Sequence, residues 1–472
     1  MKKIKIGLAG LYFPNFQAEE YKIYKRSLSA MTKLAEQLDF DLVAGVDKVS
    51  TEKEAKAAAA YFADEKVDFL LLQASSLILG DIILPFAEAS ERIGFWVVPE
   101  PVLEGELPLN SLTGFNLGVS VLRQNYPDRL VKWFYGSPEC DDYGFQDRLA
   151  VTVRALRCLK NLQNSRVGLI HDAVPTFINL TFDREGLKEH LGVEVVSLEL
   201  DEVFKGAADK EGESRAEAVA AEMVKTAAAV EVPKEEIAES SRVTNSLLGM
   251  AQKHRLDAVA LRCWPEFQDV MQLAPCASVS YLNDHGLITS CEGDLPGAVS
   301  MLAAWYISQE APTMNDPVAM DFENNLIQMW HCGPGPASWA DENGQTLDWH
   351  HTLNRRVPEG EKKSGLSSDI AFKKGAVTLL HAAGDGSTFF VMQGEVVEGP
   401  AKPYPGSGGW IGNLTCNGEP CTAADFLQSI TTYGFEHHYP IMRGHHEAAV
   451  RELASWTGIH VLDIPKAERF VK

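Results

Sequence analysis

Four side chains in the C-terminal part of this 472-residue chain could together hold a metal ion. Glu292 and Asp321 offer carboxylate oxygens, and His331 and His438 offer imidazole nitrogens. A mixed oxygen and nitrogen set of this kind suits Mn²⁺, Fe²⁺, Co²⁺ or Zn²⁺. The sequence therefore predicts a divalent metal site that needs no cysteine ligand.

The first carboxylate follows an apolar stretch that is expected to form a strand from Leu287. A helix is expected to begin near Leu295, with Asp294 as its N-cap and proline in its first turn. The end of a strand before a helix is where α/β sheets place functional groups. For Asp294 capping is the favoured interpretation, whereas for Glu292 a solvated turn and a functional role both remain open.

The second carboxylate, Asp321, ends a short apolar strand that begins at Pro317. Glu323 lies two residues further on and could share its face, so either acid could be the ligand. His331 ends the next apolar run, where a lone histidine is commonly a hydrogen-bonded core residue. Its closeness to Asp321 in sequence favours a shared site.

The fourth candidate lies in a histidine-dense segment, because His437 and His438 are followed by His445 and His446. A solvated surface loop would have the same composition. His438 is taken as the ligand, and His437 remains the alternative.

Charge and hydropathy exclude two classes of partner. The chain carries 65 acidic and 43 basic residues, a formal charge of −22, which repels phosphate backbones and anionic lipid. The apolar stretch from Ile4 to Phe13 contains Lys5 and predicts a strand, not a signal peptide. Residues 69–86 form the most apolar window, but Gln73 and Pro85 interrupt it well short of a membrane span. We expect a cytoplasmic protein that binds neither nucleic acid nor membranes.

The eight cysteines form no CxxC pair. Cys416 and Cys421 are the nearest two in sequence and flank a turn. Two reduced thiols are favoured over a bridge, since no secretory signal is expected.

Alternating strand and helix patterns predict parallel sheets wrapped by helices. The chain is expected to contain two tandem Rossmann-like α/β domains, 1–164 and 165–311, and a β-rich, barrel-like domain, 312–472. Neither α/β domain carries a nucleotide fingerprint, because the loop after the first strand lacks the third glycine and no GxxxxGK[ST] occurs. Strands are expected at residues 3–11, 41–46, 67–73, 256–262, 376–381, 388–398 and 410–416. Residues 166–172 repeat the strand-and-loop character of residues 4–10.

Four segments resemble, in order and spacing, the L-fucose isomerase and L-arabinose isomerase superfamily. They are Cys291-Glu292-Gly293-Asp294, Met320-Asp321-Phe322, Trp330-His331-Cys332 and Glu436-His437-His438-Tyr439. The resemblance implies two α/β domains before a β-rich domain, a divalent metal that is usually Mn²⁺, and interconversion of an aldose with its ketose through a cis-enediol. Carried over, Glu292 and Asp321 are catalytic and bind the metal together with His331 and His438.

The resemblance also implies a trimer or hexamer, in which a neighbour's N-terminal domain near Tyr12 completes the sugar pocket. Trp264, Arg262 and His437 are the other candidate substrate contacts. The metal-ligand pattern is mixed: an aspartate as the second acid is similar to the pattern of the fucose isomerase branch, whereas two histidines are similar to the pattern of the arabinose isomerase branch. The sugar is therefore left open among L-fucose, D-arabinose, L-arabinose and a hexose with a deoxy, sulfo or other group at C6.

Two other functions are compatible with these patterns. Tandem α/β units also occur in non-catalytic sugar-binding proteins, which close on a ligand without metal. The same ligands could also serve a metal-dependent sugar hydrolase or aldolase.

Overall fold

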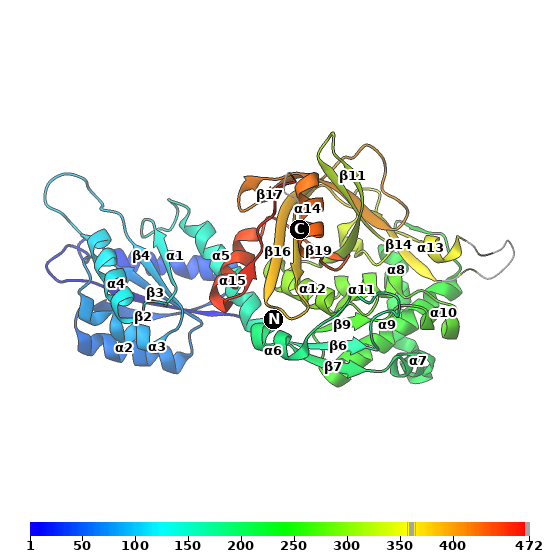
Figure 1. Ribbon diagram of the computed structural model, residues 1–472. Coiled ribbons are helices and arrows are strands. Elements are labelled where there is room, and N and C mark those ends of the chain that lie inside the picture. The colour runs from blue at the N-terminus through cyan, green and yellow to red at the C-terminus, as the bar shows by residue number, and fades with distance from the viewer. Residues whose placement is uncertain (356, 358–362, 364, 468–472) are drawn as a thin grey trace. The chain divides into compact units, whose positions relative to one another are not determined.

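The computed structural model describes residues 1–355, 357, 363 and 365–467. Contacts divide the chain into two compact units, Met1–Lys160 and Asn161–Lys472 (Figure 1). Within the described residues, no helix is long and apolar enough to cross a membrane.

The first unit is built on a five-stranded parallel sheet with the strand order β2-β1-β3-β4-β5. Its strands are β1 (Lys5–Leu11), β2 (Asp41–Val49), β3 (Phe69–Ala74), β4 (Ile93–Val97) and β5 (Val131–Tyr135). Its helices are α1 (Ile23–Leu38), α2 (Glu52–Glu65), η1 (Gly80–Ile82), α3 (Leu84–Ala89), α4 (Ser111–Asn125) and α5 (Phe145–Leu162).

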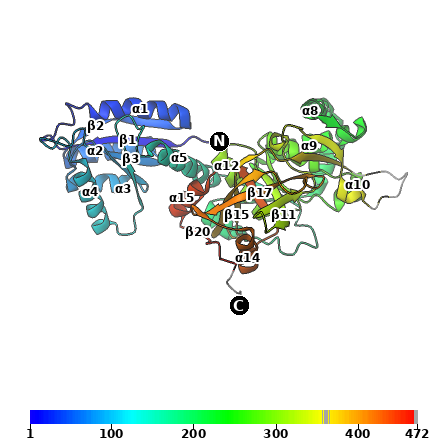
Figure 2. The ribbon, with the colours of Figure 1, turned by 90° about the horizontal axis from the view of Figure 1, so that it is seen from above.

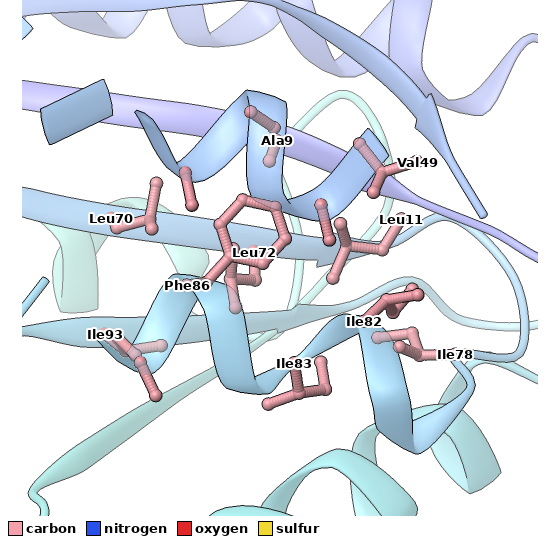
Figure 3. Close-up of a cluster of buried hydrophobic side chains, with 14 of the residues drawn as sticks. Ala9, Leu11, Val49, Leu70, Leu72, Ile78, Ile82, Ile83, Phe86 and Ile93 are labelled. Atoms are coloured by element: carbon pink, nitrogen blue, oxygen red, sulfur yellow. The ribbon is translucent and has the colours of Figure 1, made fainter. Parts of the chain in front are cut away.

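The core of this unit explains why the sequences of its strands are apolar. Every residue of β3 is buried, as expected for a central parallel strand covered on both faces. Leu70 and Leu72 of β3 pack with Phe86 and Ile93 in the cluster drawn in Figure 3. A capping box begins α2, because Thr51 accepts from the N–H of Glu54 while the Glu54 carboxylate accepts from the N–H of Thr51.

The second unit contains a four-stranded parallel sheet in the order β10-β9-β6-β7. Its strands are β6 (Arg166–Ile170), β7 (Glu194–Leu198), β9 (Ala258–Leu261) and β10 (Ile288–Ser290). The helices of this region are α6 (Arg184–Leu191), α7 (Leu200–Ala208), η2 (Lys210–Gly212), α8 (Glu213–Thr226), α9 (Lys234–His254), α10 (Glu266–Met271), α11 (Cys276–Asp284) and α12 (Leu295–Ser308).

The rest of the second unit is β-rich and forms a barrel. Strands β16, β15, β19, β11, β12 and β17 are paired in that order, and β16 also pairs with β17, which closes the ring. The strands are β8 (Ala229–Val230), β11 (Thr313–Asp321), β12 (Leu326–His331), β13 (Thr346–Trp349), β14 (Leu366–Ala371), β15 (Gly375–Ala382), β16 (Thr388–Val397), β17 (Ser407–Cys416), β18 (Glu419–Pro420), β19 (Tyr439–Arg443) and β20 (His460–Val461). The helices are η3 (Ala337–Trp339), α13 (His351–Asn354), α14 (Ala423–Tyr433) and α15 (Glu447–Thr457), of which α15 packs beside β16 and β20 (Figure 2).

Helix α12 joins the two halves of this unit. It contacts β9 and β10 of the parallel sheet and β15 and β19 of the barrel (Figure 1). Nearly all its residues are buried, which accounts for its uniformly apolar sequence. The loop that precedes α12 is thereby held against the barrel.

The predicted fold class is confirmed: two parallel α/β sheets precede a β-rich region. The contacts divide the chain once, after Lys160, so the regions predicted as separate domains on either side of residue 311 share one compact unit. The short strand β8 pairs with β13, which adds a further link between these regions. Cys416 and Cys421 are free, buried thiols flanking the turn between β17 and β18.

Candidate metal centre

Glu292 lies in a strained turn between β10 and α12. Its φ is 63°, in the left-handed region, and the φ of Gly293 is 69°. A Cβ on Gly293 would lie 2.7 Å from the carbonyl oxygen of Asp172 and 2.8 Å from Cα of Ala173, so the chain requires glycine there. A non-glycine residue in this conformation costs about 1–3 kcal/mol and is typical of functional sites. The turn aims the Glu292 side chain at the barrel residues.

His438 contacts Glu292 and also belongs to a cluster with Asp316 and His331. Nε2 of His438 lies 3.3 Å from Oε2 of Glu292 and 3.7 Å from Oδ1 of Asp316. The rings of His331 and His438 stack with centroids 5.4 Å apart. One donor atom from each of Asp316, His331 and His438 lies within 4.8 Å of the others.

The donor atoms of this cluster have no hydrogen-bond partner. Oδ1 of Asp316, Nε2 of His331 and Nε2 of His438 are all buried and unpartnered. Each such atom costs about 1–3 kcal/mol, so three at one point are unfavourable unless something binds them. A divalent cation would be a partner for all three, and Glu292 lies close enough to be a fourth ligand.

Asp294 sets the orientation of His438. The aspartate is fully buried, its Oδ1 accepts from the N–H of Gly297 at 2.8 Å, and its Oδ2 lies 2.9 Å from Nδ1 of His438. Because a carboxylate only accepts, we assign a proton to Nδ1, which leaves Nε2 to take a proton or a cation. The predicted capping role of Asp294 is confirmed, and its contact with His438 was not foreseen.

The pKa shifts describe a cluster that attracts positive charge. Burial would raise the pKa of Glu292, but the hydrogen bond to His437 and the nearby imidazole of His438 bring it well below its ordinary value. Burial would lower the pKa of His438, but the hydrogen bond to Asp294 and the nearby carboxylate of Glu292 raise it well above its ordinary value. Both shifts favour positive charge beside Glu292.

The structure does not bring Asp321 to this cluster. Asp321 ends β11 at the hairpin turn, where its carboxylate accepts from the backbone and side-chain amides of Asn324 at 3.0 and 2.7 Å. Asp316 lies five residues earlier, or roughly 17 Å along an extended strand. It pairs with Trp330, next to His331, so the antiparallel register brings Asp316 to the site. The placement predicted for Asp321 was wrong, and Glu323, the alternative, is exposed in the same turn.

The cluster opens into a cavity of about 350 Å³. Glu292, Asp316 and His331 form one part of its lining, and Trp264 and Trp330 provide aromatic surface. Such a combination of apolar walls and a few convergent polar groups is typical of small-molecule sites.

His437 lies beside the cluster. Its Nε2 is 3.3 Å from Oε2 of Glu292, and its ring packs edge-on against Phe177 with centroids 4.9 Å apart. Phe177 also contacts Trp264, so His437 and Trp264 share one aromatic neighbour. Trp264 lines the cavity, whereas His437 lies behind Glu292, outside the lining.

Arg262 and Tyr12 are not brought to the cavity of the second unit. Arg262 is 8% exposed, is paired with Glu266 and lies outside the cavity lining. Tyr12 belongs to the first unit, where it lines a pocket with Asp47 and Lys48. Any role of Tyr12 toward a sugar stays a prediction.

Comparison with known proteins identifies relatives over most of the chain. The sulfoquinovose isomerase of Priestia aryabhattai is 31% identical over 386 residues, which span 80% of this chain and 81% of that protein. The sulfoquinovose isomerase of Alkalicoccus urumqiensis is 28% identical over 373 residues, 78% of this chain and 80% of that one. The chain matches no protein-family model.

Among solved structures, an ABC transporter solute-binding protein from Agrobacterium vitis, bound with alpha-D-tagatopyranose, is 13% identical over 66% of this chain and 90% of its own. Its TM-score of 0.18 is too low to bear on fold or function. The identity to the Priestia enzyme and its coverage decide the assignment: the chain belongs to the sulfoquinovose isomerase family and is an aldose-ketose isomerase.

Proposed function

We propose that this enzyme interconverts sulfoquinovose, a hexose with a sulfonate at C6, and the corresponding 2-ketose by a metal-dependent route through a cis-enediol. The names of the relatives support the substrate. The convergence of three unpartnered buried donor atoms beside Glu292 supports the metal and is the observation that carries the proposal. We also propose membership of the L-fucose and L-arabinose isomerase superfamily. The sugar-binding alternative is not retained, because the relatives are enzymes, and the hydrolase and aldolase alternatives are not favoured, because those enzymes are isomerases.

Four residues would hold the cation: Glu292, Asp316, His331 and His438. Their oxygen and nitrogen donors suit Mn²⁺, and Co²⁺, Fe²⁺ or Zn²⁺ are compatible with the same set. When bound, the cation would act as a Lewis acid toward the carbonyl and hydroxyl oxygens of the open-chain sugar. Nε2 of His438, held in place by Asp294, would exchange its proton for the cation.

The carboxylates of Glu292 and Asp316 are proposed to transfer the protons during isomerisation. Isomerisation takes a proton from C2 and returns it to C1, while a hydroxyl proton passes from O2 to O1. One carboxylate serves the carbon proton and the other the hydroxyl proton. The lowered pKa of Glu292 keeps this carboxylate ionised at neutral pH, which is the form that binds a cation. Trp264 and Trp330 are placed to pack against the sugar chain.

The oligomeric state also remains a prediction. The superfamily resemblance implies a trimer or hexamer in which Tyr12 of a neighbour reaches the sugar.

Metal removal tests the proposal directly. After EDTA treatment and desalting, conversion of sulfoquinovose to ketose is expected to fall to background, because the carboxylates alone cannot polarise the carbonyl. Mn²⁺ is expected to restore it. Full activity in protein that elemental analysis shows to be metal-free would refute the metal, and loaded protein that converts other aldoses but not sulfoquinovose would refute the substrate.

Asp294→Asn is expected to weaken Mn²⁺ binding by roughly 10–100-fold, the usual effect of removing a carboxylate that orients a ligating histidine. The amide can still accept from the N–H of Gly297, so α12 keeps its cap. Calorimetric titration with Mn²⁺ measures the affinity. Ser300→Ala is the control, because Ser300 lies on the same helix and binds the backbone of Ala382. Equal Mn²⁺ affinity in Asp294→Asn and wild type would contradict the positioning role.

A further inference from the structure

A second group of ligand-type side chains lies on the wall of the same cavity. Cys276 begins α11, Cys332 follows β12, and His350 precedes α13. The Sγ atoms of Cys276 and Cys332 are 4.0 Å apart, and the imidazole of His350 hydrogen-bonds to Cys332. One donor atom from each of the three lies within 4.8 Å of the others.

The spacing of these donors matches a tetrahedral thiolate site. With Zn–S bonds of about 2.3 Å, two sulfurs of a tetrahedral zinc site lie roughly 3.8 Å apart. Cys276 and His350 are buried and Cys332 is half-buried, and all three line the cavity. A site with three protein ligands leaves a fourth position, which here faces the cavity.

We propose that Cys276, Cys332 and His350 form a second metal site that binds a soft, thiol-preferring divalent ion such as Zn²⁺ or Cd²⁺. Binding releases the two thiol protons to solvent and involves no change of oxidation state. Nδ1 of His350 accepts from the N–H of Leu353 at 3.1 Å. Coordination through the other ring nitrogen moves the ring proton to Nδ1 and gives up that contact.

The two sites differ in the class of ion they select. Carboxylate and imidazole donors at Glu292, Asp316, His331 and His438 suit Mn²⁺, whereas thiolates select softer ions. The sites are also adjacent, because Sγ of Cys332 lies 3.2 Å from Nδ1 of His331. An ion on Cys332 lies in the cavity wall beside the cluster. If the proposed function holds, it blocks the sugar, so Zn²⁺ inhibits even when Mn²⁺ is saturating.

A Co²⁺ titration tests the second site without using activity. With saturating Mn²⁺ present, a titration that extends beyond two equivalents of Co²⁺ is expected to produce a thiolate-to-Co²⁺ charge-transfer band in the near ultraviolet. More than one equivalent is needed because the first site also accepts Co²⁺. Carboxylate and imidazole ligands do not produce that band, so binding at the first site cannot mimic it. Cys276→Ser and Cys332→Ser are each expected to lose most of the band. Cys263→Ser, which removes another thiol of the same cavity, is expected to keep it.

Three results would overturn the second site: no charge-transfer band in the wild-type protein, a band that survives in both Cys276→Ser and Cys332→Ser, or a band lost in Cys263→Ser. The wild-type titration decides whether thiolates bind at all, so the test stands even if a variant misfolds. Circular dichroism checks the fold of each variant. A band in a protein that does not isomerise sulfoquinovose would leave the second site standing and reject the proposed substrate alone.

Discussion

Replacing Asp316 by asparagine is expected to lower kcat/KM for sulfoquinovose by at least about 10²–10⁴-fold, the range for loss of one acid–base group. Asp316 is also a proposed metal ligand, since its buried Oδ1 lies 3.7 Å from Nε2 of His438 without a hydrogen-bond partner. The amide keeps the shape of the side chain but loses the charge that binds a cation. Ketose formation at a series of Mn²⁺ concentrations measures the effect.

Asp321→Asn is the matched control, because the same change is made on the same strand. Asp321 caps the hairpin turn through Asn324, and its half-buried position at the end of β11 limits the loss of stability to about 1 kcal/mol. Its kcat/KM is expected to stay near that of the wild type. The reverse pattern, an active Asp316→Asn and an inactive Asp321→Asn, would favour Asp321, the residue that the sequence motif indicated, as the metal ligand.

Glu292→Gln is expected to lose about 10²–10⁴-fold in kcat, because the amide cannot accept a proton from the substrate. The amide keeps the size and shape of the side chain, so the turn before α12 should be retained. Ketose formation by the variant at saturating Mn²⁺ gives kcat, and circular dichroism reports the fold.

The affinity for Mn²⁺ should also be measured in the Glu292→Gln variant. His438 and Asp316 remain, so weakened Mn²⁺ binding is expected, not complete loss. A folded Glu292→Gln protein that turns over at the wild-type rate would remove Glu292 from the mechanism. Glu323→Gln serves as a control, since it makes the same change at an exposed carboxylate in the turn after β11.

The elements of the fold were predictable because their signals are local. Strand β6, Arg166–Ile170, lies within the strand-and-loop segment predicted at residues 166–172, and Asp294 caps α12 as its residue type predicts. Strand β2 extends three residues beyond its predicted end at residue 46, because pairing with β1 continues to Val49. The pairing of β16 with β17, which closes the barrel, could not be predicted in the same way, because no local sequence pattern specifies which strands pair.

The site residues also fall into two groups, those that local sequence predicted and one that only strand register could place. Glu292, His331 and His438 were found because each stands in a distinctive segment, and the structure brings all three together. Asp316 was missed, because Asp316 and Asp321 both lie on β11 and a motif cannot tell which end of the strand faces the site. The β11–β12 register was the signal that could have found it. Continued from the pair Asp321–Leu326, this register places Asp316 opposite His331, and a register shift between Pro317 and Ala319 moves the observed partner by one residue, to Trp330.

Residue types and their local order were sufficient for the class of protein, for the α/β and β-rich regions, and for three of the four side chains of the proposed metal site. These features depend on hydrophobic periodicity, caps and side-chain chemistry, which act over a few residues. Three-dimensional packing was needed to choose Asp316, to join Asp294 to His438, and to bring Cys276 beside Cys332. The physical reason is that these contacts join strands and helices far apart in the chain. Their geometry follows from strand register and from the burial of α12 between sheet and barrel.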